Sequence, residues 1–171
     1  MAESIAFSRT ADRKTIYEEI IPQVESLIAG ETDLIANLAN IAAVLKEAFG
    51  FFWVGFYLVK GGGLVLGPFQ GPLACTRIKF NEGVCGHCYT IKKTVIVSNV
   101  DEFPGHIACS SAARSEIVVP IFSGEGEVAA VLDVDSDKLD DFGDVDRDGL
   151  RAITGIVERV IRSHTNSERI E

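Results

Sequence analysis

The pattern of apolar positions first predicts two helices. Between about Thr10 and Ala29, and again between about Asp33 and Phe49, apolar residues recur every three or four positions. This spacing places them on one face of an amphipathic helix. Pro22 interrupts the first segment, so we expect a kink or a break at that residue. Both helices are predicted to pack their apolar face on a core.

From Gly50 onward the pattern changes to that of β-strands. The apolar runs become short and rich in β-branched and aromatic residues, which favour sheets, and glycine-rich turns separate them. A short helix is predicted at Val84–Lys92 and a long loop at Asn99–Ala113. The predicted strands are Phe51–Val59, Leu64–Phe69, Ala74–Phe80, Thr94–Ser98, Glu116–Phe122 and Val128–Asp135.

The order of these elements predicts an α+β fold. A last amphipathic helix is predicted from about Asp144 to His164. The hairpin turn at 123–126 favours a mainly antiparallel sheet. We therefore expect about six antiparallel strands with two N-terminal helices and one C-terminal helix packed on them. A length of 171 residues favours one domain over 1–171, with flexible termini at 1–9 and 165–171.

Composition narrows the cellular setting and the partners. The net charge of −9 disfavours nucleic acid and anionic membranes as partners, because both are bound through clustered cations. No apolar run approaches the roughly 20 residues of a transmembrane helix, and the N-terminus has no signal-peptide pattern. We expect a cytoplasmic protein, in which cysteines are more typical of catalysis or metal binding than of structural disulfides.

The four cysteines allow three interpretations. Cys85 and Cys88 form a C-G-H-C motif with the spacing of a thioredoxin-like redox pair, although no βαβ context surrounds it. Together with His106 and Cys109 they also have the ligand spacing of a structural zinc site. In the third interpretation one thiolate performs the attack and a second thiol resolves the product. Cys109, in a polar loop, suits that chemistry, whereas Cys88 fits a small buried residue.

Acidic and aromatic residues predict a ligand pocket. Asp133 lies in an apolar β run, where an unpaired carboxylate is costly. Asp135 projects from the same face of that strand, and Glu116 begins a neighbouring strand. The three carboxyl groups suit a ligand with an ammonium group, or share a proton that one of them donates to an oxygen. Trp53 and Tyr57 share a strand face and form either a pocket wall or ordinary core.

An ordered set of segments resembles one enzyme family over nearly the whole chain. The segments are Trp53–Tyr57, Gly67–Ile78, Gly83–Gly86, Phe103–Cys109, Arg114–Pro120 and Val131–Ser136. They are similar to those of the free methionine-(R)-sulfoxide reductases, single-domain enzymes of the GAF superfamily. The resemblance implies the GAF fold and the reduction of free L-methionine (R)-S-oxide, not of methionine within proteins, to L-methionine.

The resemblance also implies roles for the cysteines. Cys109 corresponds to the nucleophile that becomes a sulfenic acid, Cys75 to the resolving thiol of a Cys75–Cys109 disulfide, and Cys85 to a secondary recycling thiol. No bound cofactor and no metal are implied. A thioredoxin-like protein is expected as the external reductant, and the family is commonly homodimeric.

The same resemblance implies roles for the acids and the aromatic residues. Glu116, Asp133 and Asp135 match the substrate-binding acids, and Glu116 or Asp135 is expected to polarise the sulfoxide oxygen. Trp53 and Tyr57 match the apolar wall around the methyl-bearing end of the substrate.

Two residues depart from the pattern of the family. Cys88 stands where a small residue other than cysteine is usual, and Ser110 stands where aspartate is common. The extra thiol leaves open whether Cys75, Cys85 or Cys88 is the main resolving thiol. Two alternatives to the reductase also stay open, a small-molecule-sensing GAF module without catalysis and a Cys/His zinc-binding domain.

Overall fold

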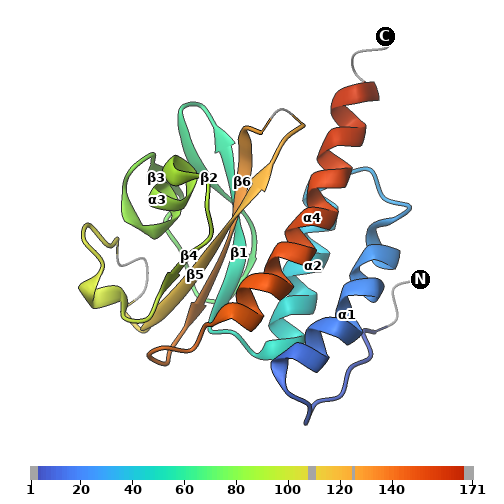
Figure 1. Ribbon diagram of the computed structural model, residues 1–171. Coiled ribbons are helices and arrows are strands. Elements are labelled where there is room, and N and C mark those ends of the chain that lie inside the picture. The colour runs from blue at the N-terminus through green and yellow to red at the C-terminus, as the bar shows by residue number, and fades with distance from the viewer. Residues whose placement is uncertain (1–3, 108–110, 125, 168–171) are drawn as a thin grey trace.

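Three helices cover one face of a six-stranded sheet, and a shorter helix lies against the opposite face (Figure 1). The computed structural model describes residues 4–107, 111–124 and 126–167, and for 163–167 the backbone alone. The α+β architecture predicted from the sequence is confirmed, with two N-terminal helices and one C-terminal helix packed on an antiparallel sheet.

The three covering helices begin and end at recognisable signals. Asp12 and Asp33 cap the first two, because each carboxylate accepts a hydrogen bond from a backbone N–H three residues on. The second helix ends at Gly50, whose φ of 66° is a left-handed conformation that glycine adopts without strain. The last helix runs three residues past the predicted end. The helices are α1 (Arg13–Ile28), α2 (Leu34–Phe49) and α4 (Asp144–Ser167).

Pro22 does not break α1, contrary to one of the two expected outcomes, because the helix continues on both sides of it. A proline in a helix leaves the carbonyl four residues earlier without its donor. That carbonyl belongs to Glu18, and both Glu18 and Pro22 are exposed, so water can satisfy it. The opposite face of α1 is buried in the core and holds the helix in place.

The sheet places the first and last strands of the chain side by side at its centre. Its order is β3-β2-β1-β6-β5-β4, and every neighbouring pair is antiparallel. The third strand is shorter than predicted and has only three residues. The strands are β1 (Trp53–Lys60), β2 (Gly63–Gln70), β3 (Arg77–Lys79), β4 (Val95–Val97), β5 (Ser115–Phe122) and β6 (Val128–Ser136).

Alternation along the central strands divides their side chains between two cores. Val54 and Phe56 of β1 pack with α1, α2 and α4, whereas Trp53 and Tyr57 pack on the opposite face of the sheet. On that face lies the fourth helix, α3 (Gly83–Ile91), and the long loop after β4 contains a 3-10 turn, η1 (Val100–Glu102). Residues of the second core surround the candidate site described next.

Candidate functional site

Strand register brings the three predicted acids together. Asp135 of β6 pairs with Glu116 of β5 on one side and with Trp53 of β1 on the other. Asp133 lies two residues before Asp135 and therefore on the same face, where it pairs with Gly55. This face is the one that α3 covers, so the three carboxyl groups point away from the helical core.

All the predicted acids and both predicted aromatic residues line one pocket between the sheet and α3. The long loop and the segment after β2 supply the rest of its walls. Leu73 is 88% exposed, so the pocket reaches the surface beside it. Sequence reasoning did not identify several of the other lining residues. The lining residues are Trp53, Tyr57, Leu73, Ala74, Ile78, Gly83, Val84, Cys85, His106, Ile107, Ala113, Glu116, Asp133 and Asp135.

The aromatic wall is tightly packed. The ring of Trp53 stacks on Tyr57 and Phe69, with centroid distances of 6.1 and 5.4 Å. Gly55 lies between the two wall residues, and a Cβ atom there would stand 2.4 Å from the Cβ atom of Phe69 and 2.5 Å from the Cη2 atom of Trp53. Glycine is therefore needed at this position because the indole ring crosses directly over it.

The polar ends of the aromatic wall hold the segment that carries Cys75. The indole Nε1 of Trp53 donates to the carbonyl oxygen of Pro72 at 3.1 Å, and the hydroxyl of Tyr57 donates to the carbonyl oxygen of Cys75 at 3.0 Å. No sequence signal points to these contacts, because their acceptors are backbone atoms of an irregular loop. Trp53 and Tyr57 thus act both as an apolar wall and as anchors for Cys75.

The cysteines are in different states. Cys75 is disulfide-bonded, whereas Cys85 and Cys88 are free and buried. Cys109 and Ser110, the predicted nucleophile and the departure next to it, lie outside the described residues. The thiol of Cys88 donates to the carbonyl oxygen of Val118 at 3.6 Å, as expected for a small buried residue inside the second core.

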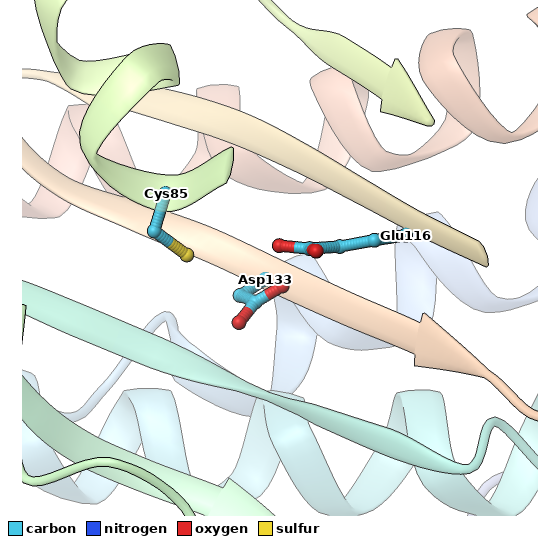
Figure 2. A group of neighbouring side chains, drawn as sticks. All are labelled: Cys85, Glu116 and Asp133. Carbon is cyan, nitrogen blue, oxygen red and sulfur yellow. The ribbon is translucent and has the colours of Figure 1, made fainter. Parts of the chain in front are cut away.

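Cys85 meets two of the acids, which the sequence did not predict. It lies in the first turn of α3 and points at the sheet, where its Sγ atom and one carboxylate oxygen each of Glu116 and Asp133 lie within 4.8 Å of one another (Figure 2). Within the described residues, Cys85, Cys88 and His106 do not form a metal-ligand group with one another. These three of the four zinc ligands expected from the sequence therefore do not come together.

The environment of Cys85 also differs from that of a thioredoxin-like thiol. Burial, followed by the charges of Asp133 and Glu116, raises the pKa of the Cys85 thiol well above its ordinary value. A reactive C-x-x-C pair needs the opposite shift, a lowered thiol pKa. The C-G-H-C motif therefore has the spacing of a redox pair without its electrostatics.

Burial raises the pKa values of all three acids. It raises the pKa of Asp133 to about 6, and contacts with Cys85 and Glu116 offset part of the rise. Burial, followed by repulsion from neighbouring carboxylates, raises the pKa values of Glu116 and Asp135 well above their usual range. Burial and mutual repulsion therefore favour the protonated forms of Glu116 and Asp135.

One carboxylate oxygen of Asp133 lacks a hydrogen-bond partner in the described part of the chain. This atom, Oδ1, is buried. The residue is only 7% exposed, and a buried oxygen of this kind costs free energy unless a ligand or an ion satisfies it. The arrangement can bind a cationic group at Asp133 and donate a proton to an oxygen from Glu116 or Asp135.

No helix among residues 4–107, 111–124 and 126–167 is long and apolar enough to cross a membrane.

Comparison with known proteins relates the chain to one family. Residues 29–162 match the GAF domain family. A free methionine-R-sulfoxide reductase from Escherichia coli is 40% identical over 88% of this chain and 91% of that protein. A GAF domain-containing protein from Dictyostelium discoideum is 52% identical over 92% of this chain and 99% of that protein.

A solved structure extends this likeness to three dimensions. The free methionine-R-sulfoxide reductase of Neisseria meningitidis, determined in complex with its substrate, is 54% identical to this chain. The two structures superpose with a TM-score of 0.89 over 92% of this chain and 95% of that one.

Proposed function

The chain belongs to the GAF-domain family of free methionine-R-sulfoxide reductases and is an enzyme of that class, and we propose that its pocket reduces free L-methionine (R)-S-oxide to L-methionine. The observation that carries the proposal is the set of three carboxyl groups, those of Glu116, Asp133 and Asp135, that line one pocket beside an aromatic wall. This set matches the ammonium group, the sulfoxide oxygen and the apolar side chain of the substrate.

We propose that the acids divide the work of binding and activation. The carboxylate of Asp133 pairs with the substrate ammonium group, which supplies the partner that its Oδ1 atom lacks. A sulfoxide sulfur is a poor electrophile until its oxygen is protonated or strongly hydrogen-bonded. The raised pKa values of Glu116 and Asp135 favour their protonated forms, so either can donate to that oxygen.

The proposed cysteine chemistry follows in three balanced steps. The thiolate of Cys109 attacks the sulfoxide sulfur, and the oxygen is transferred to the Cys109 sulfur as its bond to the methionine sulfur breaks, which leaves methionine and a sulfenic acid. The thiol of Cys75 displaces that oxygen as water and forms a disulfide, a pairing that the disulfide-bonded state of Cys75 supports. A thioredoxin-like dithiol then reduces the disulfide and is itself oxidised. Cys85 is a secondary recycling thiol. Because it is buried, it can exchange with a disulfide only when the residues around it move.

The partners and setting belong to the same proposal. The external reductant is a thioredoxin-like protein and no cofactor is resident. A reducing compartment such as the cytoplasm fits this cycle, because the disulfide must be reopened after each turnover. A homodimer is expected, and neither nucleic acid nor a membrane surface is a partner, given the net charge of −9.

The test of the proposed function is stereochemical. Reduced protein with dithiothreitol is incubated with the free R form, the free S form and an N-blocked R form of methionine sulfoxide. We expect methionine from the free R form alone, because blocking the nitrogen removes the charge that Asp133 recognises. Chromatography of the free amino acids measures the product. Absence of product from all three forms would favour a sensing GAF module without catalysis.

The anchoring role of Tyr57 leads to a further prediction. In Tyr57→Phe the ring remains but the hydrogen bond to the Cys75 carbonyl is lost. A typical hydrogen bond contributes about 1 kcal/mol, so we expect disulfide formation to slow about fivefold while methionine formation in the first turnover is unchanged. Rapid-quench assays of methionine and of free thiols measure the two steps separately.

Tyr89→Phe is the matched control for Tyr57→Phe, because Tyr89 stacks on Phe80 and does not line the pocket. It should leave both steps unchanged. Equal slowing of methionine and disulfide formation in Tyr57→Phe would show that the hydroxyl acts on the substrate and not on Cys75.

A further inference from the structure

The group formed by Cys85, Glu116 and Asp133 has the composition of a metal-ion site. We infer that these three residues bind a thiophilic divalent cation, for which Zn²⁺ is the best chemical match. Their ligand atoms lie within 4.8 Å of one another, and Figure 2 shows the three side chains converging from α3, β5 and β6. This set differs from the zinc ligands expected from cysteine and histidine spacing.

The distances are compatible with tetrahedral zinc after a small adjustment. Zinc–sulfur bonds are about 2.3 Å and zinc–oxygen bonds about 2.0–2.2 Å. Ligand atoms around one ion then stand roughly 3.5 Å apart, so atoms now within 4.8 Å close around an ion by side-chain rotation. Two of the ligands lie on paired strands, β5 and β6, whose register fixes their separation.

Asp133 provides a second, independent observation that points to a ligand. Its Oδ1 atom is buried without a hydrogen-bond partner in the described part of the chain, and the residue lines the pocket. A buried, unpaired carboxylate oxygen is costly, and a cation at this position removes that cost. The group is therefore more than a collection of acidic residues.

Ligand chemistry selects the class of ion. One thiolate with two carboxylates suits a borderline-soft ion such as Zn²⁺ or Co²⁺, whereas Mg²⁺ and Ca²⁺ prefer all-oxygen sites. On binding, the Cys85 thiol and the Glu116 carboxyl group each release a proton to solvent as their bonds to the metal form. Three protein ligands leave a fourth position open to the pocket for water.

Metal binding has a consequence for the substrate that rests on the proposed function. When Glu116 and Asp133 bind a metal ion, these two of the three acids are no longer free to bind methionine sulfoxide. Metal and substrate should then exclude each other, so that the free R form displaces the metal. This makes the cation an inhibitor of the pocket and not a cofactor.

The direct test is absorption spectroscopy with Co²⁺ as the probe, on protein that retains the Cys75 disulfide and contains no added reductant. We expect one Co²⁺ per chain, a thiolate-to-cobalt charge-transfer band, and loss of that band when Zn²⁺ is added. Cys85→Ser should abolish the band. Glu116→Gln and Asp133→Asn should each weaken Co²⁺ binding at least about tenfold.

Cys88→Ser is the matched control, because Cys88 belongs to the same motif and helix but hydrogen-bonds the Val118 carbonyl instead. It should keep the band. A wild-type protein without the band, a band that persists in Cys85→Ser, or one that disappears in Cys88→Ser would each overturn the site. The absorption readout needs no turnover, so failure of the reductase activity would not be mistaken for failure of the metal site.

Discussion

Replacing Cys109 with serine is expected to abolish methionine formation, whereas replacing Cys75 is expected to leave one turnover per chain. Loss of a nucleophile typically lowers the rate by at least about 10³-fold, and the proposal assigns that role to Cys109. Cys75 acts only after methionine has left. Cys75→Ser should therefore release one methionine per chain and then keep a sulfenic acid on Cys109.

Single-turnover assays without reductant distinguish these outcomes. Methionine is measured by chromatography, and the sulfenic acid by mass spectrometry after trapping with dimedone. Multiple turnover supported by a thioredoxin-like protein should fall at least about 10²-fold in Cys75→Ser, because the sulfenic acid lacks its resolving thiol. The structure supports this assignment through the disulfide-bonded state of Cys75.

Cys88→Ser is the control for the cysteine series. The Cys88 thiol is fully buried and hydrogen-bonded to Val118, so turnover should match that of the wild type. Accumulation of sulfenic acid in Cys88→Ser, with normal resolution in Cys75→Ser, would transfer the resolving role to Cys88. Methionine formation by Cys109→Ser would place the nucleophile elsewhere.

Replacing Asp135 with asparagine is expected to lower kcat about 10²-fold, the usual scale of one acid–base contribution. The side chain keeps its shape but loses the proton that activates the sulfoxide oxygen. Because burial raises the pKa of Asp135, the acid form persists above the ordinary carboxyl range, and the wild-type rate should fall as pH rises through that raised pKa. The variant should lose this alkaline dependence, as measured by kcat between neutral and alkaline pH.

Asp137→Asn is the matched control for Asp135→Asn, because Asp137 is exposed and does not line the pocket. Asp133→Asn provides a contrast, since loss of the ammonium partner should raise KM more than it lowers kcat. If Asp135→Asn retains full kcat with an unchanged pH profile, Glu116 becomes the proton donor.

Periodicity and turn chemistry were enough to predict the acid-bearing face of the sheet. Asp133 and Asp135 are two residues apart in an apolar run, so they had to share a face of one strand. The glycine-rich sequence at 123–126 predicts a hairpin, and the antiparallel pairing of β5 with β6 brings Glu116 opposite Asp135. Each of these inferences concerns residues that are close to one another along the chain.

The rest of the site depends on contacts that local patterns do not encode. The pairing of β1 with β6 joins residues about 80 positions apart, and only the family resemblance placed Trp53 and Tyr57 beside the acids. The approach of Cys85 to Asp133 depends on how α3 lies on the sheet. The unbroken α1 at Pro22 depends on which side of the helix meets solvent.

The central pairing of β1 with β6 has a consequence for synthesis of the protein. The ribosome makes β1 early, but its partner emerges only when the chain has reached Ser136. Until then one edge of β1 stays open to pairing with other chains, which is a route to aggregation. A nascent or truncated chain that ends before Val128 lacks both Asp133 and Asp135, so premature termination yields a fragment with the cysteines, the aromatic wall and Glu116 but without the proposed ammonium partner.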